Sequence, residues 1–245
     1  MLLPSQTVQL DEQSVAIPPF IRYPILRQLT ERVQQETLNA LADSALHTAQ
    51  QSSRSARLLD SLYQTPIADA SILVAITHER HPKLLLTRRA AHMNSHAGEV
   101  SCAGGKYEIG DGNNVVTALR EACEETALPP NKVQLIGQLP IQTSKSGMSV
   151  RPIVALIAPD LVLVPEIGEI SRIFWADFEA LLTQPTVEYA IEYAMQDQVA
   201  TILTPSWQVD GETVWGLTGR VIASLLETAF DRQLEWYYRV QDSRL

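Results

Sequence analysis

A pair of glycines followed by an acidic helix is the feature that most constrains how this chain folds. Gly104-Gly105 enters a turn-rich loop, and a helix is predicted after it at about residues 115–126. At about 100° per residue, three glutamates project from one side of that helix: Glu121, Glu124 and Glu125. Clustered carboxylates repel one another, whereas Mg²⁺ binds carboxylate and phosphate oxygens. The pattern alone fits a metal site and a solvated acidic face about equally well.

Apolar runs of strand length surround this stretch. Residues 71–77 and 83–87 predict a hairpin, because a polar turn separates them. The other predicted elements are strands at 99–103, 133–139, 150–157, 169–175 and 211–215, a strand pair within 189–205 with its turn near 196–197, a short helix at 177–182 and a closing helix at 219–232. The acidic helix is expected to bury Val116, Leu119 and Cys123.

The N-terminal part of the chain follows a different pattern. Residues 1–20 are polar and irregular, whereas residues 21–62 repeat apolar side chains at three-to-four spacing. A polar stretch at 50–55 predicts a loop within this segment. We therefore expect two or three amphipathic helices, which either pack against the rest of the chain or form an interface with a second subunit.

The charge balance and the cysteine content exclude several classes of protein. A formal net charge of −9 argues against broad nucleic-acid binding, which requires a basic surface. Cys102 and Cys123 are too few for a disulfide framework and lack partners for a zinc site. We find no signal-peptide pattern, and no apolar run of the roughly 18 residues that span a membrane. We expect a reduced, cytoplasmic protein that binds neither nucleic acid nor membrane.

Basic side chains gather where the second predicted strand ends. Arg88 and Arg89 follow the strand at residues 83–87, and a pair of arginines there either clamps phosphate or stays solvated at a strand edge. His92 and His96 are four residues apart, a spacing that can bind metal on a helix. No helix is predicted around them, so we do not expect a histidine metal site.

The segment from Arg120 to Leu128 resembles the signature of the Nudix hydrolases. The second half of their signature reads Arg-Glu-apolar-x-Glu-Glu-x-Gly-apolar, and this chain has Arg120-Glu121-Ala122-Cys123-Glu124-Glu125-Thr126-Ala127-Leu128. The first half is one residue longer than usual, so that its acidic position falls on Gly112, next to Asp111. The order of strand, glycine pair and acidic helix is also similar to that of the family.

Residues upstream of the signature resemble one branch of the family, the bacterial coenzyme A pyrophosphatases. The similar segments are Leu85-Leu86-Thr87-Arg88-Arg89-Ala90, His96-Ala97-Gly98-Glu99-Val100 and Cys102-Ala103-Gly104-Gly105. The longer first half of the signature is also typical of this branch. The departures are Ala90 for serine, Cys102-Ala103 for Phe-Pro and Ala127 for glycine, which leave every carboxylate in place but bear on substrate preference.

The resemblance implies an architecture. We expect an α/β Nudix fold, in which a mixed β-sheet is sandwiched between helices, at residues 67–232. A helical extension at residues 1–66 would precede this domain, and a short tail at residues 233–245 would follow it.

The resemblance also implies metal-dependent hydrolysis of a diphosphate linked to a nucleoside. Coenzyme A would give 3′,5′-ADP and 4′-phosphopantetheine. The implied ligands of Mg²⁺ or Mn²⁺ are Glu121, Glu124, Glu125 and a backbone carbonyl of Gly104 or Gly105, with Asp111 as a further outer ligand. The implied general base is Glu121 or Glu169, and Arg120 would support the helix carboxylates. The implied substrate-binding residues are Arg88, Arg89, His96 and Gly104.

Two other functions stay open at this point. The first is a Nudix hydrolase of another nucleotide, such as ADP-ribose, NADH or a dinucleotide polyphosphate, because specificity resides in loops. The second is a binding or regulatory module that retains the fold without catalysis. The three clustered glutamates argue against the second, since a pure binding module does not need them. The expected partner is a small nucleotide, and a homodimer is possible.

Overall fold

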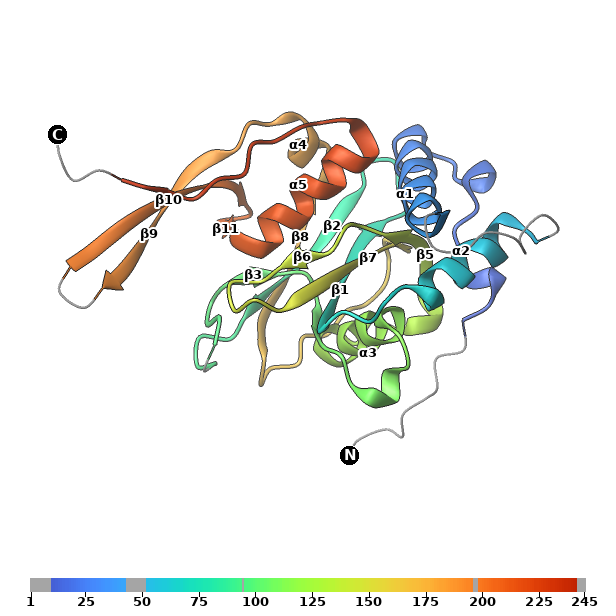
Figure 1. Cartoon of the computed structure of the whole chain (residues 1–245), viewed down its shortest axis with the longest axis horizontal. Helices are drawn as coiled ribbons and strands as arrows, with labels where there is room; N and C mark the ends of the chain where they lie inside the picture. The colour runs from blue at the N-terminus through green and yellow to red at the C-terminus, as the bar shows by residue number, and fades with distance from the viewer. Residues whose placement is uncertain (1–9, 43–51, 94, 196–197, 242–245) are drawn as a thin grey trace.

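A mixed sheet forms the centre of the protein, whose computed structural model describes residues 10–42, 52–93, 95–195 and 198–241. In this sheet β1 (Ala70–Thr77) lies between β2 (Lys83–Arg89) and β7 (Ser149–Ile157). β1 pairs antiparallel with β2 and parallel with β7. Every residue of β1 except Ile72 is buried, because helices cover both faces of the central strands (Figure 1).

The remaining strands extend this sheet in both directions. β5 (Val133–Gln138) continues it beyond β7, and β8 (Ile170–Asp177) pairs with β2. Three short strands join it as well: β3 (Val100–Ser101) on β2, β4 (Gly104–Lys106) on β1 and β6 (Gln142–Thr143) on β7. The predicted hairpin of β1 and β2 is confirmed.

Helices on both faces of the sheet confirm the predicted α/β sandwich. α2 (Arg54–Gln64) and α3 (Asn114–Thr126) share one apolar cluster with the sheet. The opposite face is covered by α1 (Pro24–Ala42), α4 (Phe178–Thr183) and α5 (Gly216–Phe230) (Figure 1). Within the described part of the chain, no helix combines the length and the apolar character that crossing a membrane requires.

The N-terminal helices are part of this packing. In α1, Leu26, Leu29 and Val33 are fully buried, and the helix contacts α5 and β5. α2 begins at Arg54, where the Ser53 side chain accepts the N–H of Ala56. The predicted loop at 50–55 therefore overlaps the start of α2, and its first residues lie outside the described residues. The described helices therefore pack against the rest of the chain, and an interface with a second subunit stays a prediction.

A long hairpin projects beyond this body (Figure 1). It consists of β9 (Val187–Met195) and β10 (Gln198–Val209), which pair antiparallel. The predicted strand pair is therefore confirmed, and its turn at 196–197 lies outside the described residues. At the base of the hairpin β11 (Glu212–Val214) pairs with β10, and β12 (Arg239–Val240) pairs with the middle of β10. We refer to β9, β10 and β12 as the arm.

Two details of the acidic stretch differ from the sequence prediction. The glycine pair lies in strand β4 rather than in a loop, and the strand predicted at 99–103 is limited to β3. Leu119 is buried as predicted, whereas Val116 and Cys123 are only half-buried, so the helix turns a partly different row of residues inward. The buried apolar row consists of Val115, Ala118, Leu119 and Ala122.

The departure at Ala127 has a structural consequence. Ala127 ends α3 in the left-handed conformation, with φ at 55°, and donates its N–H to the Cys123 carbonyl. Glycine is the usual residue at such a helix end because a Cβ is disfavoured there. Alanine at this position therefore strains the backbone by about 1 kcal/mol.

We predict that Ala127→Gly stabilises the protein by about 0.5–1 kcal/mol, since relief of the left-handed strain outweighs the added freedom of the unfolded chain. Ala40→Gly is the matched control, because Ala40 is exposed inside α1 and its replacement should destabilise by about 1 kcal/mol. Chemical denaturation measures both. Shifts of the same sign in the two variants would contradict the prediction.

Candidate active site

The three glutamates of α3 lie in different surroundings. The side chain of Glu125 is 5% exposed, that of Glu121 is 18% exposed and that of Glu124 is 59% exposed. Asn113 fixes the start of the helix by accepting the N–H groups of Val115 and Val116. α3 packs directly against β1 and β4, so that Glu121 and Glu125 lie beside the glycine strand.

The glycine pair makes room for these carboxylates. Gly104 N–H donates to Glu125 Oε2 at 3.1 Å. A Cβ on Gly105 would lie 2.3 Å from the carboxyl carbon of Glu121, so only glycine permits that approach. A Cβ on Gly104 would lie 2.4 Å from the Ser71 carbonyl oxygen of β1. One glycine therefore allows strand pairing and the other admits the helix carboxylate.

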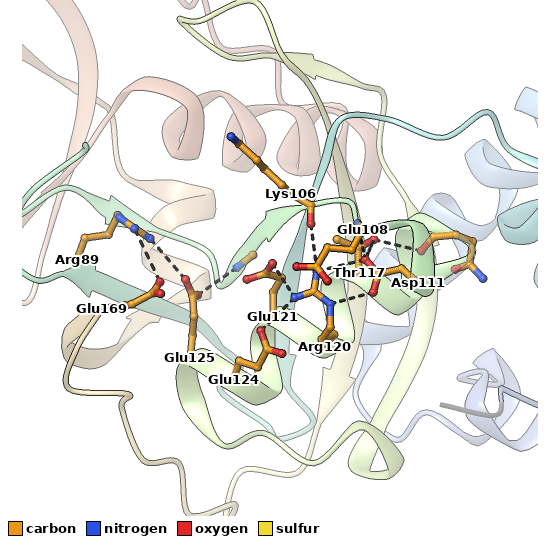
Figure 2. A network of polar contacts seen from close by, with 12 residues as sticks. Arg89, Lys106, Glu108, Asp111, Thr117, Arg120, Glu121, Glu124, Glu125 and Glu169 are labelled. Atoms are coloured by element: carbon orange, nitrogen blue, oxygen red, sulfur yellow. Dashed lines mark hydrogen bonds and ion pairs between the residues drawn. The ribbon is translucent and has the colours of Figure 1, made fainter. Parts of the chain in front are cut away.

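Arg89 at the end of β2 and Glu169 just before β8 complete the cluster. Arg89 Nη1 lies 3.5 Å from Glu125 Oε1, and its Nη2 lies 4.0 Å from Glu169 Oε2 (Figure 2). The Nε of Arg89 is buried and has no hydrogen-bond partner within the described residues. Glu125 is thus held between a backbone N–H on one side and a guanidinium on the other.

Main-chain hydrogen bonds determine where Glu169 stands. In the loop before β8, the N–H groups of Val164 and Glu166 donate to the carbonyls of Thr126 and Glu125, each at 2.9 Å. The Glu169 carbonyl accepts the N–H of Ala90 at 2.7 Å. This loop is therefore bound to the last turn of α3 and to the end of β2. Sequence reasoning missed these bonds because main-chain groups leave no residue signature.

Arg120 connects the helix carboxylates to Asp111. Its Nε and Nη2 donate to the two oxygens of Asp111 at 2.8 and 3.2 Å. Its Nη1 lies 2.9 Å from Glu121 Oε1 and 3.0 Å from Glu124 Oε2 (Figure 2). The predicted support of the helix carboxylates by Arg120 matches this geometry. Asp111 also accepts Thr117 Oγ1 and the Glu108 N–H, so its carboxylate anchors Arg120, and its role as an outer metal ligand stays a prediction.

Two residues predicted to bind substrate are not brought to this cluster. Arg88 Nη1 lies 3.3 Å from Glu212 Oε1 of β11, on the opposite face of the sheet from Arg89, because successive side chains of a strand alternate. His96 Nδ1 lies 2.8 Å from Glu99 Oε2. In the structure both side chains are occupied by acidic partners outside the glutamate cluster.

The departures at Cys102 and Ala103 lie in the core. Cys102 is 2% exposed and Ala103 is 1% exposed, and they belong to the apolar clusters on opposite faces of the sheet. Burial raises the pKa of the Cys102 thiol to about 12, so the thiol stays protonated and unreactive. These two residues therefore affect packing under the glycine pair, and they add no functional group to the cluster.

Burial controls the proton affinity of the carboxylates. It raises the pKa of Glu125 from 4.5 to about 7, although Gly104 N–H and Arg89 oppose the rise. Burial also raises the pKa of Glu121, against the attraction of Arg120. The pKa of Asp111 is lowered, since hydrogen bonds from Arg120, Glu108 and Thr117 outweigh the effect of burial. A buried carboxylate with a raised pKa is typical of functional sites.

The donor set fits a hard divalent cation by its chemistry. Carboxylate and backbone carbonyl oxygens are the ligands that Mg²⁺ and Mn²⁺ prefer. In the present side-chain arrangement, no group of three or more His, Cys, Asp or Glu side chains among the described residues is placed to hold a metal ion. The glutamates instead turn to Arg89 and Arg120. Metal binding therefore requires small side-chain movements and stays a prediction.

Comparison with known proteins identifies the family. A family model described as the NUDIX domain matches residues 68–196. The chain belongs to the Nudix family. The matched residues include β4, α3 and Glu169, so the carboxylate cluster lies within the shared domain.

Relatives of known sequence match over most of their own length. The uncharacterized Nudix hydrolase NudL of Pectobacterium atrosepticum is 37% identical over 163 residues, which cover 66% of this chain and 83% of that protein. NudL of Escherichia coli K12 is 36% identical over 156 residues, which cover 64% of this chain and 80% of that protein. A similar solved structure is that of a MutT/nudix family protein from Enterococcus faecalis, with 15% sequence identity and a TM-score of 0.42. The match covers 81% of this chain and 73% of that chain.

We predict a pH dependence of stability that originates at Glu125. Between pH 4.5 and about 7 the folded chain keeps a proton on Glu125 that the unfolded chain releases. The free energy of unfolding should therefore fall as pH rises through this range, by on the order of 3 kcal/mol from this group. Glu125→Gln cannot ionise and should lack this component. Denaturation in chelator compares the two proteins, and parallel pH profiles would contradict the prediction.

Proposed function

We propose that this Nudix hydrolase cleaves the diphosphate of a nucleoside-linked substrate in a reaction that requires Mg²⁺ or Mn²⁺, and that its substrate is coenzyme A or a derivative. The observation that carries the proposal is the buried Glu125, which lies between Gly104 N–H and Arg89 with Glu121 close by. Burying a carboxylate beside other carboxylates is costly unless cations neutralise them. Such a site is therefore suited to assemble around metal and phosphate.

The residues that would hold the cation are Glu121, Glu124, Glu125 and the backbone carbonyl of Gly105. A cation bound there neutralises phosphate charge and lowers the pKa of water. Arg120 suits this arrangement, because its Nε and Nη2 are bonded to Asp111 and could stay so if its Nη1 gave up Glu121 and Glu124 to the cation. We treat Arg120 as a positioning residue, since it acts through the glutamates.

Arg89 is the residue that we assign to the phosphates. Its guanidinium already lies between Glu125 and Glu169, and its Nε donor has no partner within the described residues. A guanidinium matches two phosphate oxygens at once and stays charged at all relevant pH values. Gly104, which has no side chain, would let the backbone come close to the substrate. Arg88 and His96 would first have to leave Glu212 and Glu99, so their predicted contact with substrate is secondary.

The general base is Glu121 or Glu169. Either carboxylate would accept the proton of the attacking water at an Oε atom, while the oxygen of that water bonds to phosphorus and the bond to the bridging oxygen breaks. Glu169 is 54% exposed and is fixed through the main chain of its loop, so it can meet solvent without moving the helix. Glu121 lies deeper and contacts Arg120.

Coenzyme A is favoured by the sequence around the site. The segments Leu85–Ala90, His96–Val100 and Cys102–Gly105 resemble the additional motif of the coenzyme A branch. In the structure they form the end of β2, the turn before β3 and the strand that carries the glycine pair. The first and third contact the carboxylate cluster through Arg89 and the glycine pair, and the turn joins the end of β2, where the Glu99 carbonyl accepts the Arg89 N–H. This arrangement supports a shared role in placing the substrate. Cleavage would yield 3′,5′-ADP and 4′-phosphopantetheine.

We predict that Glu125→Gln lowers turnover by more than about a hundredfold while the protein stays folded, because the amide cannot balance a divalent charge. Glu36→Gln, at an exposed position of α1, is the matched control and should keep full turnover. Steady-state assays with circular dichroism decide the outcome. Near-normal turnover of the Glu125 variant would remove this residue from the mechanism.

We predict that the protein with Mg²⁺ or Mn²⁺ cleaves coenzyme A in preference to ADP-ribose, NADH and dinucleotide polyphosphates, and that EDTA abolishes cleavage. Mass spectrometry of the products separates the possibilities. Preference for another nucleotide would reject the coenzyme A assignment and keep the Nudix chemistry. Cleavage of none of the substrates would favour a binding module, and cleavage in EDTA would reject the metal mechanism.

A further inference from the structure

The arm presents an unpaired strand edge. β9 pairs with β10 along its whole length, from Val187 opposite Ser206 to Met195 opposite Gln198. β12 pairs with the other edge of β10, where Ile202 lies between Ile191 and Val240. Within the described residues the outer edge of β9 pairs with no strand. Its outward N–H and C=O groups are therefore available to another strand.

β9 lacks several of the features that protect exposed edges. It is nine residues long and contains no lysine, proline or glycine. Its residues alternate, with Val187, Tyr189 and Ile191 on one face and the glutamates on the other. Ile202 and Val240 continue the apolar face across the arm, and Val240 is 66% exposed. A narrow ribbon with an open apolar face is only marginally stable by itself in water.

We propose that β9 pairs antiparallel with β9 of a second copy of this chain, about a two-fold axis at Ile191. In this register position 191 lies opposite itself, position 189 opposite 193 and position 187 opposite 195, so that all nine residues enter the ladder. Tyrosine is then opposite tyrosine and apolar residues are opposite apolar residues. Each glutamate is opposite an alanine: Glu188 faces Ala194, and Glu192 faces Ala190.

The charges of β9 disfavour the neighbouring registers. A two-fold axis perpendicular to the sheet keeps the apolar faces of both copies on the same side, so it must pass through a residue position. Moving the axis to Ala190 sets Glu188 opposite Glu192, and moving it to Glu192 sets that glutamate opposite its own copy. Directly opposed like charges are destabilising. Larger shifts shorten the ladder, so the axis at Ile191 is the favoured one.

The symmetry of the sequence argues for a second copy over a different partner. On its apolar face the strand reads nearly the same in both directions from Ile191: tyrosines lie two positions away and apolar residues four positions away. Pairing with its own copy sets these like residues opposite one another. The pairing would join the two arms into one sheet, with β12, β10 and β9 contributed by each copy. The N-terminal helices, by contrast, are packed against their own chain.

Sedimentation of the full chain over a range of concentrations tests the proposal. We expect a dimer that Ile191→Arg converts to a monomer, because two arginines would meet across the axis. Ile109→Arg is the matched control, since Ile109 is 94% exposed outside the arm and its variant should stay dimeric. A monomeric parent chain, or a dimer that Ile191→Arg leaves intact, would overturn the proposal.

Cysteine cross-linking provides a second test that does not depend on a charged substitution. Ile191→Cys brings two thiols face to face across the axis, whereas Glu192→Cys sets each thiol opposite Ala190. Under mild oxidation we expect roughly tenfold more covalent dimer from the first variant, because disulfide geometry is restrictive. Equal cross-linking at the two positions would reject this register. The oligomeric state and the cross-link are both measured without substrate, so they stand or fall separately from the hydrolase assignment.

Discussion

The burial of the Glu125 carboxylate is the interaction on which the rest of the site depends. An ionised carboxylate at that depth requires compensation, and the fold provides it from two directions through Gly104 N–H and Arg89. Each donor comes from a different strand of the same sheet, β4 and β2. The helix, the glycine strand and the end of β2 therefore meet at this one carboxylate. Arg89 and Arg120 neutralise the negative charge of the carboxylate cluster only in part, so the cluster favours the binding of a further cation.

The sequence predicted the parts of this arrangement that follow from spacing. Glutamates at positions 121, 124 and 125 of a helix share one side whatever the tertiary structure, and the order of strand, glycines and helix indicated the family. The hairpin of β1 and β2 and the long hairpin of the arm followed from apolar runs divided by polar turns. These features are local, so periodicity and turn chemistry were sufficient for them.

Other parts depended on tertiary contacts that spacing does not contain. Arg88 and Arg89 are adjacent and chemically equal, yet strand alternation turns one to Glu212 and the other to Glu125. Asp111 resembled a metal ligand by its position next to the acidic site of the signature, whereas its partners are Arg120 and Thr117. In α3, Leu119 was predicted correctly, but Val115 and Ala122 are buried in place of the predicted Val116 and Cys123, and Glu125 lies on the buried side as well.

The attachment of the loop before β8 limits how this protein can change. The N–H groups of Val164 and Glu166 donate to carbonyls at the end of α3, and the N–H of Ala90 donates to the Glu169 carbonyl. The loop is therefore held at both ends by main-chain hydrogen bonds. Inserting or deleting a residue in this loop would therefore change the distance between Glu169 and Glu125. Variation in loop length, through which enzymes commonly acquire new substrates, is therefore costly on this side of the site. New specificity would more readily arise at connections that are fastened to the cluster less tightly, such as the polar turn between β6 and β7.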